Sequence, residues 1–433
     1  MRNMTLTYSG GSILPRVILL VVTLILLLAF SEIILRLMTR EPAELSLLRA
    51  ADFQAIYFEP DPVLGIVRRA NLDVRFRFEE RPSGFIHFQT NNLGLRRVEP
   101  TEQNKGSKRR ILVLGDSQID GSVDNQENVC ALLESALNSG PTRYEVLNAA
   151  TGSYSPYQAY LWYRTRGRAL QPDVVIFTIF LGNDLAELVA PGRPRLMPDR
   201  KGFCEISVTE DYQRRMKTYR EPSGWTRLRF FLLQNSVLFG RLSSFAGGSG
   251  VQATGPMSRA YRCCIGCTGQ SLGQAHWFKN HPQDAHLSML SLQELLRRFR
   301  TDVEQSGGHL IVLVLPSRLQ VEAEQDAERT RKVAQILELS AENLELESRL
   351  AHETVSIARE LEIDTVDVTP LMAGFHRKSG ENLYCDTDWH LDPAGHRFLA
   401  EQLETLTFSW SASGQSAPRP RTRLRANTGP DPR

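Results

Sequence analysis

The sequence predicts an α/β protein, with a three-layer α/β/α domain of about five parallel strands preceded by one transmembrane helix. Three observations support this prediction. A long apolar run stands near the N-terminus, short apolar runs alternate with amphipathic stretches after residue 110, and several of these runs end at turns rich in Gly, Asp and Asn. Strand-like segments that alternate with helical ones are typical of a parallel sheet covered by helices on both faces.

The composition is that of an ordinary globular protein. The chain has 433 residues, of which 42% are hydrophobic and 23% are charged, and its formal net charge is +2. This length exceeds that of one average domain, although an α/β domain with insertions can use most of it. Because so small a net charge creates no strong electrostatic field, we do not expect nucleic acid as a partner.

An apolar run over residues 17–38 dominates the N-terminal part. As a helix it would be about 33 Å long, enough to cross a hydrocarbon core of about 30 Å. Its charged residues, Glu32 and Arg36, stand near one end, where an i,i+4 pair can form and long side chains reach the interface. We therefore predict a membrane anchor in residues 1–40. A cleaved signal peptide is the alternative, because residues 29–31 have a small-x-small pattern.

The leader before this run carries Arg2 and Arg16 and no acidic residue, which favours an N-inside orientation. The rest of the chain is then expected in the periplasm or outside the cell. Six cysteines, an even count, are compatible with an oxidising compartment. Cys264 and Cys267 have the spacing of metal ligands, but no second such pair follows, so a disulfide or free thiols are favoured over a metal site. No metal and no cofactor are predicted.

The strands are expected in two groups. Residues 41–109 predict a small β-rich segment, because Gly, Pro and Asn punctuate short alternating pieces. In the α/β domain, expected at residues 110–408, the run at residues 173–181 is long and β-branched, which is typical of a central strand buried on both faces. The five strands of the parallel sheet are predicted at residues 111–114, 144–148, 173–181, 309–315 and 363–368. Helices are predicted at residues 128–137 and 158–170, with one or two amphipathic helices within residues 327–361.

A long interruption lies at about residues 186–282, where prolines, cysteines and a Gly/Ser-rich stretch occur. Plain connections are rarely so long, so we expect a lid or a substrate-binding insertion, with disorder as the alternative. The tail at residues 409–433 is rich in Arg and Pro and is predicted to be disordered.

Polar residues at the ends of the first three strands are the candidates for chemistry, because active sites of open α/β sheets gather at the carboxyl ends of strands. Ser117 follows the first strand, where its hydroxyl can be exposed and the next helix can supply backbone N–H donors. Gly152 follows the second strand and can offer a backbone amide to a substrate. Asn183 follows the third, and its side chain can donate to an oxyanion or cap a helix.

A serine nucleophile needs a neighbouring base to accept its proton. His390 is the strongest candidate, since it lies after the last strand and just before the final helix. Two nearby acids, Asp386 and Asp388, can orient the imidazole through its other nitrogen and stabilise the cation that forms during proton transfer.

Taken together, these blocks resemble the SGNH (GDSL-like) hydrolases in their order and their placement at strand ends. The blocks are Gly115-Asp116-Ser117, Gly152, Gly182-Asn183-Asp184, and an Asp/His block followed by Pro393 and Gly395. The resemblance spans about residues 110–407 and implies the flavodoxin-like SGNH fold. It also implies that Ser117 is acylated while its own amide, the Gly152 amide and the Asn183 side chain hold the oxyanion. The N-terminal anchor and residues 91–96 are similar to the membrane-attached bacterial branch, which includes polysaccharide O-acetyl esterases and acetyltransferases.

The sequence departs from the usual family pattern at two positions. Many members place the acid three residues before the histidine, where this chain has Thr387. Asp388 matches the Asp-x-His form of some polysaccharide-modifying relatives and is our predicted third member of the triad, with Asp386 as the alternative. Gln118 follows the nucleophile where many relatives have Leu, Phe or Tyr, and we expect this departure to affect the shape of the pocket more than the mechanism.

From these features we expect a carboxylic ester hydrolase that acts on small acyl esters, with O-acetyl groups of cell-envelope glycans as the expected substrate. Two alternatives stay open. The same acyl-enzyme can transfer its acyl group to a polysaccharide hydroxyl. A non-catalytic envelope module that keeps the fold is the other alternative, because a fold does not establish an activity.

Overall fold

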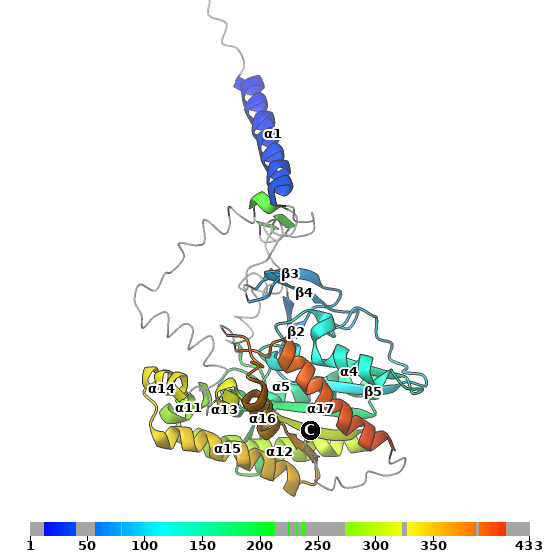
Figure 1. Ribbon diagram of the computed structural model, residues 1–433, viewed down its shortest axis with the longest axis vertical. Coiled ribbons are helices and arrows are strands. Elements are labelled where there is room, and N and C mark those ends of the chain that lie inside the picture. The colour runs from blue at the N-terminus through cyan, green and yellow to red at the C-terminus, as the bar shows by residue number, and fades with distance from the viewer. Residues whose placement is uncertain are drawn as a thin grey trace, which may run out of the picture.

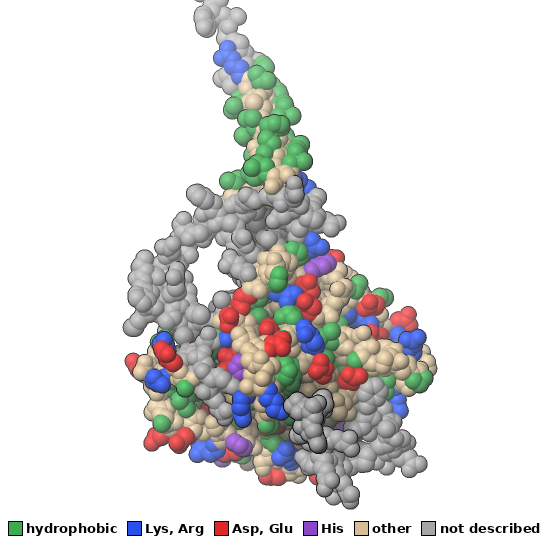
Figure 2. All heavy atoms as spheres, viewed as in Figure 1, with side chains coloured by type: hydrophobic (Ala, Val, Ile, Leu, Met, Phe, Trp, Pro, Cys, Tyr) green, Lys and Arg blue, Asp and Glu red, His purple; other side chains and the backbone are tan. Residues whose placement is uncertain are grey.

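The computed structural model describes residues 13–39, 57–78, 80–210, short pieces between residues 212 and 242, and residues 273–322, 327–386 and 389–412. The helix α1 (Ile13–Thr39) extends away from the rest of the molecule as a single rod (Figure 1). Its stretch Leu14–Met38 is long and apolar enough to cross a membrane and has no buried residue, features that also fit a signal sequence. Figure 2 shows hydrophobic side chains over most of α1, whereas charges of both signs are mixed over the domain.

The charged end of α1 contacts another part of the chain. Arg36 donates to Glu32 at 2.7 Å, which confirms the predicted i,i+4 pair. The Glu32 carboxylate also accepts hydrogen bonds from the Ser236 hydroxyl at 2.8 Å and from the backbone amides of Val237 and Leu238 at 3.0 and 2.9 Å. The predicted insertion therefore reaches the end of α1.

A five-stranded parallel sheet forms the centre of the domain, in the order β11-β10-β7-β5-β6. Each of the five strands predicted from the sequence is present, which confirms the fold class. The strands are β5 (Arg109–Leu114), β6 (Tyr144–Asn148), β7 (Val174–Phe180), β10 (His309–Leu315) and β11 (Asp364–Asp367). As expected from its continuous apolar sequence, β7 is central and buried at every residue.

Two hydrophobic clusters, one on each face of the sheet, make the three layers. Along β7 the side chains alternate between them, so that Phe177 joins one cluster and Ile176 the other. The Phe177 cluster includes α5 (Pro156–Thr165), α12 (Pro282–Gln305) and α15 (Ala341–Glu360). The Ile176 cluster includes α4 (Val129–Leu137), α16 (Thr369–Ser379) and α17 (Pro393–Ala412). Figure 1 shows these helices around the sheet.

Shorter helices connect the main elements. They are α3 (Ser117–Asp120), α6 (Asp184–Glu187), α11 (Gly273–Asn280), α13 (Arg318–Glu322) and α14 (Ala327–Ile336), with 3₁₀ turns at Asn125–Glu127 and Gly167–Leu170. Helix starts follow from local capping. Ser155 and Gln158 form a capping box with Pro156 in the first turn, so α5 begins two residues before the predicted helix. The predicted amphipathic stretch at residues 327–361 forms two helices, α14 and α15, because Ser340 caps a new helix there.

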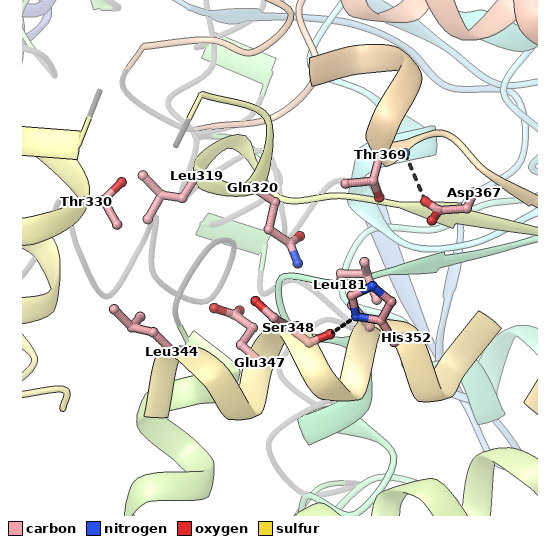
Figure 3. A pocket seen from close by; sticks show the side chains of 11 residues that line it. Leu181, Leu319, Gln320, Thr330, Leu344, Glu347, Ser348, His352, Asp367 and Thr369 are labelled. Atoms are coloured by element: carbon pink, nitrogen blue, oxygen red, sulfur yellow. Dashed lines mark hydrogen bonds between the residues drawn. The ribbon is translucent and has the colours of Figure 1, made fainter. Parts of the chain in front are cut away.

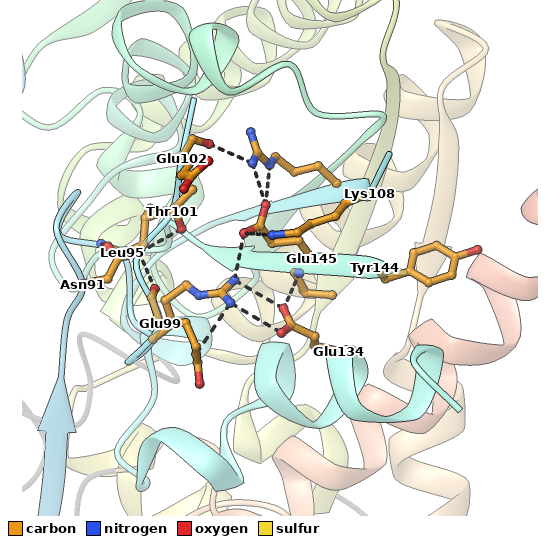
Figure 4. A network of polar contacts seen from close by, with 12 residues as sticks. Asn91, Leu95, Glu99, Thr101, Glu102, Lys108, Glu134, Tyr144 and Glu145 are labelled. Carbon is orange, nitrogen blue, oxygen red and sulfur yellow. Dashed lines mark hydrogen bonds and ion pairs between the residues drawn. The ribbon is translucent and has the colours of Figure 1, made fainter. Parts of the chain in front are cut away.

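Two antiparallel hairpins precede the sheet. β1 (Phe58–Asp61) pairs with β2 (Gly65–Arg68), and β3 (Asp73–Arg77) pairs with β4 (Phe85–Gln89). A polar network then joins the following loop to the sheet (Figure 4). Its centre is the buried Arg110, which donates to Glu145 at 2.7 Å and to the backbone carbonyls of Gln103 and Glu102. Because a buried charge is costly unless it is paired, this network fixes the path of the loop into β5.

Part of the predicted insertion is packed against the domain. A hairpin of β8 (Arg195–Asp199) and β9 (Gly202–Ile206) is held by Glu205, which pairs with Arg164 of α5 and Arg298 of α12 at 2.8 and 3.0 Å. Residues 243–272, with the Cys264 and Cys267 cluster, and the predicted tail after residue 412 lie outside the described residues. Among the described residues the cysteines are free thiols, at Cys130, Cys204 and Cys385.

Candidate active site

The nucleophile candidate sits in a tight turn at the carboxyl end of β5. Gly115 is needed there because a Cβ at this position would lie 3.1 Å from Cβ of Thr178 on the neighbouring strand. Asp116 caps α3 by accepting a hydrogen bond from the Gln118 amide at 3.0 Å. Ser117 is the first residue of this short helix and is half-buried. Its hydroxyl thus stands at a helix N-terminus on the edge of the sheet where the sequence predicted it.

Gly152 lies beside Ser117, as expected. A Cβ built on Gly152 would lie 3.7 Å from Cβ of Ser117. The backbone amide of Gly152, which the family resemblance assigns to the oxyanion hole, donates to the Asp120 carboxylate at 2.9 Å in this structure. The next residue, Ser153, is exposed and has a positive φ of 69°. The loop therefore approaches the nucleophile closely, with the Gly152 amide held by Asp120.

Asp120 is a member of this site that sequence reasoning missed. Its carboxylate also accepts from the Tyr57 hydroxyl and from Arg68 at 2.8 Å, and the side chains of Arg68 and Asp120 are 3% and 8% exposed. Arg68 reaches further to the Asn148 carbonyl at 2.9 Å. Burial first of all, together with the adjacent Asp120 carboxylate, raises the pKa of Tyr57 well above its usual range, so the phenol stays protonated and donates. The β-rich segment is thus bonded directly to the nucleophile helix.

Asn183 follows β7, at the start of α6. It makes no side-chain cap to that helix, which was the alternative role. Its side-chain amide donates to Glu187 at 3.4 Å, and its carbonyl oxygen is buried without a partner among the described residues. The group that could donate to an oxyanion is therefore present at the expected strand end, held by a weak hydrogen bond.

Three carboxyl groups that affect one another lie near Ser117, of which Asp116 and Asp184 are buried and Glu187 is half-buried. Burial raises the pKa of Asp116 to about 7, against the opposing effects of the Gln118 amide and the His390 charge. The pKa of Asp184 is raised well above its usual range by burial and by the neighbouring Asp116 and Glu187. Burial also raises the pKa of Glu187, although Arg193 donates to it at 2.9 Å. The raised pKa values of these carboxyl groups favour their neutral forms and so reduce the negative charge near Ser117.

His390 comes from the loop before α17. The residues on either side of it, Trp389 and Leu391, are hydrogen-bonded through their backbone to the side chain of Gln118, the residue after Ser117. The backbone of the loop is fixed, because the Cys385 amide donates to the His390 carbonyl at 2.8 Å. The fold therefore brings the predicted base to the nucleophile turn.

The two candidate acids differ. Asp386 accepts a hydrogen bond from Arg318 at 2.7 Å, and its side chain is 63% exposed. Asp388, the predicted third member of the triad, lies outside the described residues. The partner of Arg318 on its other side is Glu322 at 2.8 Å, so this arginine ties α13 to the histidine loop.

A pocket of about 350 Å³ opens at the carboxyl ends of β7 and β11 (Figure 3). Leu181 and Asp367 line it at the sheet, and Gln320, Leu344 and Glu347 line it from α13 and α15. Figure 3 shows Gln320 and Glu347 directed into this space. Burial raises the pKa of Glu347 well above its usual range, which favours the neutral form of its carboxyl group. Neither Ser117 nor His390 is among the lining residues, so the pocket is separate from the nucleophile turn.

Comparison with known families agrees with this geometry. Residues 273–422 match the family model described as "SGNH hydrolase-like domain, acetyltransferase AlgX". This part of the chain is thus similar to an SGNH hydrolase-like domain. The matched range contains His390, whereas Ser117 and the first three strands of the SGNH hydrolase-like fold precede it. No curated protein sequence matches the chain.

Solved structures similar to the chain include esterases and lipases of low sequence identity. The acetyl xylan esterase AlAXEase has 12% identity and a TM-score of 0.35, with 69% of this chain and 98% of that chain covered. The lipase/acylhydrolase from Enterococcus faecalis has 9% identity and a TM-score of 0.35, with 70% and 96% covered. The acetylxylan esterase Axe2 from Geobacillus stearothermophilus has 12% identity and a TM-score of 0.35, with 69% and 93% covered.

Proposed function

We propose that the chain is a serine esterase that hydrolyses small acyl esters through an acyl-enzyme on Ser117. The observation that carries this proposal is the meeting of two distant segments, in which the His390 loop packs on the residue that follows Ser117. A serine at a helix N-terminus with a histidine base beside it is the arrangement that nucleophilic acyl transfer requires.

The proposed reaction has two halves. The Ser117 hydroxyl attacks the ester carbonyl while His390 accepts its proton, and the Ser117 amide and the Asn183 side chain donate to the oxyanion. The Gly152 amide joins them when it turns from Asp120. The imidazolium, stabilised by Asp388, then protonates the leaving alcohol. In the second half a water molecule gives its proton to His390 and attacks the acyl carbon. The bond between this carbon and the Ser117 oxygen then breaks, His390 returns the proton to that oxygen, and the acid is released.

Acyl transfer is a second candidate, favoured by one specific observation. The family model that matches residues 273–422 is described as an acetyltransferase. The same acyl-enzyme can be attacked by a carbohydrate hydroxyl in place of water, with His390 accepting the hydroxyl proton. We propose acetyl as the acyl group for either reaction and an envelope glycan as the carbohydrate.

We further propose that α1 is retained as an anchor and that the domain works on the outer side of the membrane. The length and exposure of α1 support this, as does the bonding of Glu32 to residues 236–238, because a helix that packs against the mature domain has a structural reason to stay.

The test is Ser117→Ala in the detergent-solubilised full chain, assayed on p-nitrophenyl acetate. We expect hydrolysis to fall by about 10³-fold or more, because the remaining groups cannot form an acyl-enzyme. Ser135→Ala, an exposed serine on α4, is the matched control and should leave the rate unchanged. Equal rates in Ser117→Ala and the unaltered protein would refute the proposal.

A labelled acetyl donor separates the two candidate reactions. Label found only in free acetate in the presence of a glycan acceptor identifies hydrolysis, and label on the glycan identifies transfer. If a fluorophosphonate probe fails to label Ser117 in folded protein, the chain is a non-catalytic module instead.

A further inference from the structure

Gln118, the residue after the proposed nucleophile, connects it to the proposed base. Its side chain is fully buried, with 0% exposed. The side-chain carbonyl accepts a hydrogen bond from the Leu391 amide at 3.0 Å, and the side-chain NH₂ group donates to the Trp389 carbonyl at 3.3 Å. These two backbone groups stand on either side of His390, so one amide side chain holds the chain before and after the imidazole.

The other end of Gln118 is fixed to the nucleophile turn. Its backbone amide donates to Asp116 at 3.0 Å, and the residue lies within α3, directly after Ser117. Because the backbone of Gln118 moves with Ser117 and its side chain with the His390 loop, the residue sets the distance between the two proposed catalytic groups.

The histidine loop needs such support. Trp389 has a positive φ of 56°, a conformation that is unfavourable for a bulky side chain and persists only where several contacts impose it. The Trp389 indole N–H donates to the Asp386 carbonyl at 3.0 Å, and the Arg318 guanidinium lies 5.9 Å from the centre of a Trp389 ring. The hydrogen bond from Gln118 to the Trp389 carbonyl adds to these two contacts. Of the three, it is the contact that comes from α3, the helix that contains Ser117.

We propose that Gln118 is a positioning residue, which places His390 for proton transfer from Ser117 by holding the backbone on both sides of the imidazole. This inference rests on the proposed function. Leu, Phe and Tyr side chains lack the carboxamide that supplies a donor and an acceptor together, so this chain uses the position to build its site and not only to shape the pocket.

The first test is Gln118→Met, which keeps the length of the side chain and removes both hydrogen bonds. A displacement of about 1 Å at a catalytic group can cost about 10²-fold in rate, so we expect kcat on p-nitrophenyl acetate to fall by about that factor while KM changes little. Gln118→Glu keeps an acceptor for the Leu391 amide and loses the donor, and should recover part of the rate.

A double-mutant cycle with His390→Ala separates positioning from plain stability. If Gln118 acts through His390, Gln118→Met should cause no further loss of activity or of fluorophosphonate labelling in the His390→Ala background. Gln158→Met is the matched control, because Gln158 is also 0% exposed, and its side chain accepts from the Ser155 amide before α5 and donates to the Leu64 carbonyl. Gln158→Met should lower the unfolding temperature, and its effect on activity should be the same in the original and the His390→Ala backgrounds.

The imidazole signals of His390, followed by NMR in histidine-labelled protein, give a readout that needs no enzymatic activity. We expect them to shift in Gln118→Met and Gln118→Glu and to stay in place in Gln158→Met. The proposal would be overturned if Gln118→Met lowered the activity by the same factor in the His390→Ala background as in the original protein. Unchanged His390 signals together with an unchanged kcat in Gln118→Met would also overturn it. Shifted His390 signals in a protein whose Ser117→Ala variant is as active as the original would instead refute the proposed function alone.

Discussion

Two effects on the pKa of Asp116 oppose each other. Burial raises the pKa, whereas the hydrogen bond that its carboxyl group accepts from the Gln118 amide lowers it. Asp116 caps α3, and it is buried next to Asp184 and Glu187, so burial raises its pKa to about 7. A carboxyl whose pKa is higher in the folded protein than in the unfolded chain binds its proton more tightly when folded. Its contribution to stability is therefore complete below the unfolded pKa and is lost as the pH rises through about 7.

Asp116→Asn should remove this loss, because the amide mimics the protonated acid and its oxygen can still accept from the Gln118 amide. We expect the urea midpoint of the variant to fall less than that of the unaltered protein between pH 5 and pH 8. Unfolding curves of both proteins at the two pH values check this, and equal falls would contradict it. Asp184 is present in both proteins, but loss of the neighbouring Asp116 charge lowers its raised pKa, so its effect on the comparison has the same direction.

The residues of the site divide into those that sequence could predict and those that it could not. Ser117, Gly152 and His390 follow strands or precede a helix, and strand ends of one parallel sheet meet at one edge, so their proximity was predictable. Asp120 was not, because its partners Tyr57 and Arg68 lie more than fifty positions upstream and only the fold reveals their burial. Gln118 was assigned to pocket shape, since nothing in its local sequence indicates contact with a loop 271 to 273 residues away.

The strand β2 acts on α3 through one buried ion pair. Arg68 and Asp120 are almost fully enclosed, while the neighbouring pair of Arg69 and Glu59 is 27% and 48% exposed at 3.4 Å. Removing one partner of a buried pair leaves an uncompensated charge and costs about 3 to 5 kcal/mol, whereas an exposed pair contributes about 1 kcal/mol or less.

Arg68→Met should therefore destabilise the protein by about 3 kcal/mol, toward the lower limit because Asp120 keeps its bonds from Tyr57 and Gly152. Arg69→Met, the adjacent control, should cost about 1 kcal/mol or less. Denaturant unfolding of the two variants measures the difference. Similar losses in both would show that the β-rich segment does not support α3 through this pair.

The elements themselves were predictable where the apolar pattern is simple. The five parallel strands and the two amphipathic helices α14 and α15 follow the expected positions. The hairpin of β8 and β9 lies within the predicted insertion and was not predicted. The alternation of apolar and polar residues in its strands is weak, and the hairpin is held mainly by Glu205, which pairs with α5 and α12. The helix α12 was not predicted either, although buried residues such as Ala285, Met289, Leu292 and Leu296 recur at helical spacing.

At the scale of the whole molecule, none of the 25 residues of the apolar stretch of α1 is buried. An apolar surface of this extent is unfavourable in water, so the helix must either lie in a bilayer or be cleaved from the protein. We expect the mature protein to keep residues 1–39 and to stay in the membrane fraction after an alkaline carbonate wash. Intact-mass measurement of the purified protein checks this. A mass that lacks about the first 31 residues, with release of the protein from the membrane, would identify a cleaved signal peptide.

The hydrogen bond between Gln118 and Leu391 spans 273 positions of the chain. During synthesis from the N-terminus, β5, β6 and β7 emerge long before the loop that carries His390, and contacts of such separation close late. A growing or truncated chain would thus hold its serine without its base. On the proposed mechanism, Ser117 would therefore become reactive only when nearly the entire polypeptide has been made.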